Sequence, residues 1–361
     1  MGGCPRVALP VAEAPSWSAS RRAGAARGAY PAPAMRTLIV GAGMVGTIYG
    51  WALAEAGAEV VHVVRPGRLP VGRVELDVLD ERPGFPRQRR ARYRPEAVDR
   101  VPAGSDFDLV IVATKHYQAA EAVAQYREAV HEATFLLFTA NWDGPAEIDR
   151  LLPRRQYVWG YSASMGGRLD GRLLITVRHR VRLGRLEGSD LERFAAVVHL
   201  MEHAGFRADI KPDIVEWLWV HHAINAGTIG IALFAGGVGA VLKRPGLMHR
   251  GVSCAREALA VVAARGVDVE HYPEARTILH TPGWVAAAGY AGQLLLTSSG
   301  RRVIRAGHFQ GNDEEMRRFY LDVLETGERL RVPVPHLAAL RARIMEGRGT
   351  PTPRPAGPGG G

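Results

Sequence analysis

The stretch TLIVGAGMVG, residues 37–46, decides the fold of this chain. It joins a short β-branched strand directly to three glycines in the spacing Gly-x-Gly-x-x-Gly, and a helical pattern then runs to Gly57. A second apolar strand at residues 60–64 completes a strand, turn, helix and strand of the length that holds one half of a dinucleotide. We therefore expect the first part of the chain to be built around a parallel sheet.

Each position in this turn has a physical role. Gly41 permits the tight turn, Gly43 lets backbone N–H groups approach a pyrophosphate, and Gly46 lets the helix pack closely on the strand. Met44 and Val45 follow in the first turn of the helix, whose amino end favours a phosphate group. The pattern predicts a dinucleotide site, and a tight structural turn is the alternative.

The end of the second strand predicts which dinucleotide binds. An NAD site normally has Asp or Glu there to accept a hydrogen bond from the ribose 2'-hydroxyl, whereas this chain has Arg65 and Arg68. A guanidinium at that place suits a 2'-phosphate, so we expect NADP(H) as the cofactor. A merely solvated arginine pair is the alternative interpretation.

The pattern changes near residue 208. Up to about residue 184, short β-branched runs alternate with helical stretches, which is typical of a parallel sheet with crossover connections. The expected strands are 37–40, 60–64, 109–113 and 135–139. Residues 73–80 alternate apolar and charged side chains and residues 88–94 are polar, so we expect an antiparallel hairpin at the edge of the sheet.

Helical patterns dominate after residue 209, at 214–242, 246–265, 273–296, 312–331 and 335–345. The predicted fold is an α/β Rossmann-type domain at 35–207 followed by an all-α domain at 208–345. Residues 1–34 and 346–361 are rich in Gly and Pro and lack a sustained apolar period. We expect a disordered extension or a mis-called start at the first and a disordered tail at the second.

Charge and cysteine content argue against several protein classes. The formal net charge is +10, but eight of these charges lie in the two tails and in residues 81–100, so we expect no nucleic-acid partner. Residues 218–242 carry no charged side chain, yet they include two histidines and five glycines, and we interpret them as a buried core helix without a membrane partner. Two cysteines and no metal-ligand cluster indicate a reducing, cytoplasmic compartment and no metal.

Further motifs resemble one known family. Beside the glycine turn, they are ATKHYQ at 113–118, TAN at 139–141, AINA at 223–226, an apolar-Pro-apolar stretch at 241–247, and VPVP at 332–335. Together they resemble the ketopantoate reductase (2-dehydropantoate 2-reductase) family over roughly residues 35–344.

This resemblance implies an NADPH-dependent reductase of a small 2-oxo acid, converting 2-dehydropantoate to pantoate or acting on a related substrate in or near pantothenate biosynthesis. It also implies a helical domain like the C-terminal domain of 6-phosphogluconate dehydrogenase, and a possible homodimer. It places Lys115 and Gln118 near the cofactor, and Asn141 near the nicotinamide and the substrate. An ordinary strand-ending turn is the alternative for Asn141.

The helical domain departs from the family at its catalytic motif. The family has Lys-x-x-x-Asn-x-x-x-Asn on one helix face, with the lysine as general acid, whereas this chain has Trp217, His221 and Asn225. His221 could replace the missing acid, with Asn225 beside it on the same face. Alternatively, Trp217 fills the place of the acid and the protein binds NADP without turnover.

The last family element is a glutamate that contacts the substrate, and Glu315 matches it. The family's serine has candidates in Ser298 and Ser299, but they lie too far before Glu315, so we expect a longer, rebuilt loop at residues 300–311. Three functions follow: a 2-oxo acid reductase, a non-catalytic NADP-binding protein, or an opine-type dehydrogenase that joins an amine to a 2-oxo acid.

Overall fold

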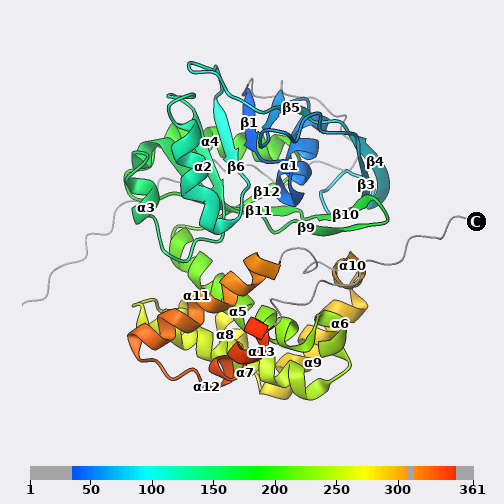
Figure 1. Ribbon diagram of the computed structural model, residues 1–361, viewed down its shortest axis with the longest axis vertical. Coiled ribbons are helices and arrows are strands. Elements are labelled where there is room, and N and C mark those ends of the chain that lie inside the picture. Colours follow the sequence, from blue (N-terminus) through cyan, green and yellow to red (C-terminus); the bar gives the residue numbers. More distant parts are fainter. Residues whose placement is uncertain (1–34, 307–312, 347–361) are drawn as a thin grey trace, which may run out of the picture. The chain divides into compact units, whose positions relative to one another are not determined.

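The computed structural model describes residues 35–306 and 313–346, so the predictions for 1–34 and 347–361 lie outside it. In these ranges an α/β part precedes a helical part (Figure 1), which confirms the predicted fold class. The larger sheet consists, in order across it, of β12 (Arg207–Ile210), β11 (Arg180–Gly184), β8 (Tyr157–Tyr161), β7 (Thr134–Phe138), β6 (Leu109–Val112), β1 (Thr37–Val40), β2 (Val60–Val63) and β5 (Glu96–Val98).

The centre of this sheet is parallel and buried. β5, β2, β1, β6, β7 and β8 pair in parallel, and every residue of β1, β2, β6 and β7 is buried. The helices of this part are α1 (Met44–Glu55), η1 (His116–Gln118), α2 (Ala119–Tyr126), α3 (Ala146–Asp149), η2 (Arg154–Gln156) and α4 (Leu191–His203). Because the parallel strands end at one edge, the loops that follow β1, β6, β7 and β8 lie along that edge.

The predicted hairpin forms, but its place was wrong. β3 (Val74–Asp80) and β4 (Gln88–Tyr93) are antiparallel, as expected. They belong to a separate sheet of order β4-β3-β10-β9, with β9 (Met165–Leu169) and β10 (Arg172–Val177). The apolar residues of β3 need a partner, and β10 supplies it, since Leu76 pairs with Leu173 and Val78 with Ile175.

The boundary between the two parts lies slightly later than predicted. The boundary at 207/208 falls inside β12, which pairs with β11, and the helical part begins at Ile214. Its helices are α5 (Ile214–Ala235), α6 (Val238–Leu242), α7 (Pro245–Ala264), η3 (Val269–His271), α8 (Pro273–His280), α9 (Gly283–Leu296), α10 (Ser298–Ala306), α11 (Asp313–Leu330), α12 (Pro335–Ala338) and α13 (Arg341–Glu346).

Three predictions for the helical part were wrong in detail. The helix expected over 214–242 is broken at Gly236 and Gly237, whose φ angles of 83° and 124° only glycine adopts readily. The loop expected at 300–311 is instead the helix α10 up to Ala306, and residues 307–312 lie outside the described ranges. The helix expected over 273–296 is likewise divided, into α8 and α9.

α5 is the core helix of the helical part. It packs against α7 and α11, and a side chain at Gly227 would meet the Ala255 nitrogen at 2.4 Å, so the α5 and α7 backbones approach closely there. Among the described helices, α5 alone is long and apolar enough to cross a membrane, and 56% of its apolar window is buried in the protein. These contacts favour the interpretation of α5 as a core helix.

Candidate active site

The glycine turn has the geometry of a phosphate cradle. Gly41 has a φ of +98°, and a Cβ at Gly46 would lie 2.5 Å from the Gly41 carbonyl oxygen. A Cβ at Gly43 would meet no atom within 4 Å, and Gly43 is exposed, so its backbone is open to a ligand. Met44 and Val45 begin α1, whose first turn carries no acidic residue to repel a phosphate. These residues fit a dinucleotide.

A buried histidine, which the sequence reasoning missed, supports this turn. His62 in β2 has its Nδ1 3.0 Å from the Gly41 carbonyl oxygen and its Nε2 2.9 Å from the Tyr93 hydroxyl. Since a carbonyl oxygen only accepts, Nδ1 carries the proton and Nε2 accepts from Tyr93. Burial lowers the pKa of His62, which keeps the imidazole neutral. A Cβ at Gly50 would lie 2.4 Å from the His62 Nε2, so the ring needs a glycine at this position of α1.

Arg65 and Arg68 follow β2 in a turn, where the Arg68 N–H donates to the Arg65 carbonyl oxygen at 3.1 Å. Both side chains are exposed. Within residues 35–306 and 313–346, neither guanidinium has a hydrogen bond or an ion pair with another side chain. Both are therefore available to a 2'-phosphate.

Lys115 and Gln118 come together just after β6, at the edge that carries the glycine turn. The Gln118 N–H donates to the Lys115 carbonyl oxygen at 2.9 Å, which closes the short helix η1. Both side chains are partly buried, and the Lys115 ammonium lies 5.9 Å from the centre of the Tyr117 ring.

The side chain of Asn141 is engaged in a local turn. Its amide Nδ2 donates to the Gly144 carbonyl oxygen, and its Oδ1 accepts from the Asp143 N–H at 3.0 Å. This arrangement fits the structural alternative for Asn141 better than a role at the substrate.

A polar cluster forms where α5 meets the end of β8. The His221 Nε2 and the Tyr161 hydroxyl are 2.8 Å apart, and their ring centres are 4.5 Å apart. Asn225, one turn further along α5, lies beside the same hydroxyl, where its amide lowers the pKa of Tyr161. The predicted pair His221 and Asn225 is therefore brought together, with a tyrosine as its third member.

Charge states in this cluster differ from those expected. Burial lowers the pKa of His221 to about 3, with further contributions from Arg182 and His222. The imidazole is therefore neutral near pH 7, which argues against the imidazolium acid that was one of the two alternatives from the sequence. Burial raises the pKa of Tyr161 to about 12, although Arg182 and Asn225 oppose that rise. Tyr161 keeps its proton and can donate it.

Arg182 brings a positive charge to the cluster. It pairs with Tyr161 across the antiparallel strands β11 and β8. Its guanidinium carbon lies 4.6 Å from the centre of the Trp217 ring, and its Nε lies 3.8 Å from Asp209. Trp217 is almost fully buried, stacks on His221 with ring centres 5.0 Å apart, and donates from its indole to Glu274 at 2.6 Å. The tryptophan is thus a packed part of the site wall.

Comparison with known proteins gives the family of the first part of the chain. The sequence model of the family described as Ketopantoate reductase PanE/ApbA matches residues 37–188. Residues 37–188 form a ketopantoate reductase family domain. That domain contains the glycine turn, Lys115 and Tyr161, and it reaches just past Arg182.

Relatives extend the likeness beyond this ketopantoate reductase domain. The chain is 24% identical to the uncharacterized oxidoreductase YkpB of Bacillus subtilis (strain 168) over 242 residues, which are 65% of this chain and 77% of that protein.

Two solved structures share the fold of the ketopantoate reductase domain and of the helical part. One is 2-dehydropantoate 2-reductase from Geobacter metallireducens GS-15, with a TM-score of 0.65, 15% identity, and coverage of 87% of this chain and 100% of that chain. Another is D-mandelate dehydrogenase with NADH and anilino(oxo)acetate, with a TM-score of 0.64, 16% identity, and coverage of 86% and 97%.

The remaining predicted residue, Glu315, lies near the start of α11. Its carboxylate is close enough to Tyr161 to raise the pKa of that phenol. Glu315 therefore acts on Tyr161 through its charge, and its contact with the substrate stays a prediction. Ser298 and Ser299 instead begin α10, where the Ser299 hydroxyl lies 3.4 Å from that of Thr297 and its side chain is largely buried.

His222, the neighbour of His221 on α5, packs inside the protein. It is fully buried and stacks on Phe319 and Trp142, with ring centres 4.3 and 4.9 Å away. Asp322 of α11 lies 3.4 Å from His222 and 3.2 Å from His116 of η1, so this group ties the ketopantoate reductase domain to the helical part.

Proposed function

We propose that this protein is a reductase of a 2-oxo acid that uses a nicotinamide dinucleotide, with NADPH preferred. The observation that carries the proposal is the phenol of Tyr161, which keeps its proton near neutral pH because its pKa is raised to about 12. It lies 2.8 Å from His221 and opposite Arg182 in the strand pairing. Reduction of a 2-oxo acid needs such a proton donor beside a fixed positive charge.

When bound, the reduced nicotinamide supplies the hydride to the carbonyl carbon. The residues of this chain hold the acid and deliver the proton. The positive charge of Arg182 favours the substrate carboxylate, and the Asn225 amide donates to the carbonyl oxygen. Tyr161 then gives its proton to that oxygen as the negative charge develops.

His221 has a supporting role in this proposal. The neutral imidazole keeps its proton on Nε2 and donates it to the Tyr161 oxygen, which leaves the phenol proton free to face the substrate. The same N–H, together with Arg182, stabilises the transient phenolate until a proton from solvent restores the phenol.

The preference for NADPH is supported by Arg65 and Arg68, which are exposed and carry no partner among the described side chains. A solved structure of similar fold, D-mandelate dehydrogenase, holds NADH, so NADH is the alternative cofactor. Titration of the protein with each reduced dinucleotide, followed by nicotinamide fluorescence, distinguishes the two.

A second candidate function rests on Trp217. This buried indole occupies the position at which the family resemblance expects the catalytic lysine, which favours a protein that binds NADP without turnover. NADPH oxidation with 2-dehydropantoate and a panel of 2-oxo acids tests both candidates. Turnover of any member supports the reductase, whereas tight NADPH binding without turnover of any member supports the non-catalytic protein.

We further propose a cytoplasmic homodimer. Cys254 is buried with its pKa raised to about 12, so its thiol is inert and needs no oxidising compartment. Trp284 and Leu296 of α9 expose 72% and 78% of their surface, which suits a contact with a second copy. Sedimentation velocity of the wild type and of a Trp284→Glu, Leu296→Glu variant measures that contact.

A further inference from the structure

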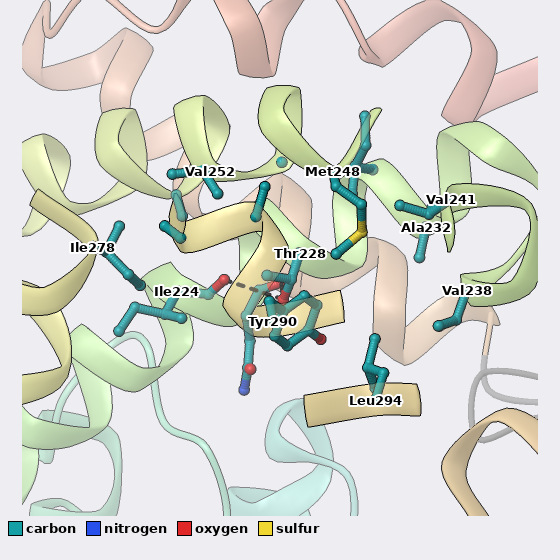
Figure 2. Close-up of a pocket in the computed structure, with 16 residues that line it drawn as sticks. Ile224, Thr228, Ala232, Val238, Val241, Met248, Val252, Ile278, Tyr290 and Leu294 are labelled. Atoms are coloured by element: carbon teal, nitrogen blue, oxygen red, sulfur yellow. Dashed lines mark hydrogen bonds between the residues drawn. The ribbon is translucent and has the colours of Figure 1, made fainter. Parts of the chain in front are cut away.

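A largely apolar cavity of about 160 Å³ lies between α5, α7 and α9. Figure 2 shows side chains from these helices converging on it, among them Ile224, Thr228, Met248, Val252, Tyr290 and Leu294. We propose that this cavity receives the side chain of the substrate, and that the substrate is a 2-oxo acid with a bulky apolar side chain, either aromatic or branched aliphatic. This inference rests on the proposed function.

The cavity begins at the reacting cluster. Asn225 lines it, and the same Asn225 lies beside the Tyr161 hydroxyl. Thr228, the next residue of this α5 face, also lines the cavity, while His221 lies one turn earlier, against Tyr161. An acid whose carbonyl oxygen is held by Asn225 and Tyr161 can therefore extend its side chain past Asn225 into the cavity.

The lining leaves few hydrogen-bonding groups for a ligand. The Thr228 hydroxyl donates to the backbone of its own helix, with the Ile224 and Asn225 carbonyl oxygens 3.2 Å away. The Tyr290 hydroxyl lies next to the same Thr228. Apart from the Asn225 amide, the other lining side chains are apolar, and none of the described lining residues is charged. A hydroxyl on the ligand would find only these few polar groups as partners, which disfavours the hydroxymethyl group of 2-dehydropantoate.

The volume fits a ring or a branched chain. Apolar cavities of about 150 Å³ stay dry and bind benzene, and this cavity is about 160 Å³. A methyl group, as in pyruvate, would leave most of the space empty and would gain little from its contacts.

Kinetics with a filled cavity test the proposal. Wild type should reduce phenylglyoxylate and 4-methyl-2-oxopentanoate with a kcat/KM at least tenfold above that for pyruvate or 2-dehydropantoate. Ala286→Phe places a ring in the cavity from α9, and should lower kcat/KM for phenylglyoxylate at least tenfold, so that the preference over pyruvate disappears. Ala288→Phe is the matched control, because Ala288 is exposed on the same helix and does not line the cavity. Val252→Phe should act like Ala286→Phe, from α7.

Binding without turnover supplies the second readout. Oxamates resemble 2-oxo acids but resist reduction. Calorimetric titration of the NADPH-loaded protein therefore measures the affinity for the oxamate side chain without any turnover. N-benzyl oxamate should bind at least tenfold more tightly than oxamate to wild type and to Ala288→Phe, but not to Ala286→Phe.

The outcomes separate the two proposals. Equal affinities for the two oxamates in wild type, or an Ala286→Phe preference unchanged from wild type, would overturn the cavity assignment even if the protein is a reductase. Selective binding of N-benzyl oxamate without turnover of any 2-oxo acid would support the cavity assignment and refute the reductase.

Discussion

Replacement of Tyr161 by phenylalanine removes only the phenol oxygen from the candidate site. Its effect on turnover therefore measures the phenol as a proton donor and leaves the other polar groups in place. We expect kcat for the preferred 2-oxo acid to fall by about a hundredfold or more, since a positioned general acid contributes about 10²–10⁴. A hundredfold loss corresponds to about 2.7 kcal/mol of transition-state stabilisation. NADPH affinity should stay within about twofold, because the Tyr161 hydroxyl bonds to His221 of α5 and not to the glycine turn.

The same substitution has a structural cost that must be measured separately. His221 loses the hydroxyl that lies 2.8 Å from its Nε2, and the lost partner of a partly buried group costs about 1 kcal/mol of unfolding free energy. Tyr157→Phe is the matched control on the same strand. It removes the hydroxyl that donates to Asp149 at 2.7 Å, away from the cluster. It should lower stability similarly and leave kcat near the wild-type value.

The pH profile distinguishes the phenol from an imidazolium donor. A donor must be protonated, so its contribution is lost as pH rises through its pKa. With Tyr161 at about 12 and His221 at about 3, the wild-type kcat should be flat from pH 6 to 9. A kcat that falls through a midpoint between pH 6 and 7, or a Tyr161→Phe variant with wild-type kcat, would refute the assignment of the phenol as donor.

Three further predictions concern the cofactor site. Arg65→Ala together with Arg68→Ala should remove a preference for NADPH over NADH of at least about tenfold, roughly 1.4 kcal/mol, measured by fluorescence titration. Gly43→Ala should weaken NADPH binding without lowering the thermal midpoint, since its methyl meets no protein atom within 4 Å. Gly46→Ala should lower both the NADPH affinity and the thermal midpoint, because its Cβ would lie 2.5 Å from a carbonyl oxygen. His62→Leu should raise the Kd for NADPH several-fold by releasing the Gly41 carbonyl, and an unchanged Kd would exclude a positioning role for His62.

The sequence was sufficient for the features that depend on local geometry. A glycine spacing between a strand and a helix has one common structural solution, so β1, the turn and α1 follow from residues 37–55 alone. The face of α5 is equally local, and it brings His221 and Asn225 to one hydroxyl. The role of Asn141 was left between the substrate and a turn for a local reason as well. Its side chain can hydrogen-bond within its own turn, to Gly144 and Asp143, without any distant partner.

The missed residues depend on strand pairing, which a single sequence does not fix. Tyr161 closes β8 at the edge that carries the glycine turn, and that position was a usable signal. Arg182 reaches the same place only because β11 runs antiparallel to β8 in one register. A shift of one residue would turn Arg182 to the opposite face. The pKa of His221 could not be read from residue order either, because burial and Arg182 together set it.

The replacement of the expected lysine by Trp217 changes the electrostatics of the site without removing its positive charge. Arg182 and Lys211 lie 4.6 and 5.9 Å from the centre of the Trp217 ring, where the aromatic face attracts cations. Lys211 is also 3.2 Å from Asp209, which holds it beside the indole. A lysine at position 217 would add a further cation next to Arg182 and His221. With an uncharged indole there, the imidazole stays neutral and hydrogen-bonded to Tyr161, which is why we propose a neutral phenol as the proton donor in place of a cationic amine.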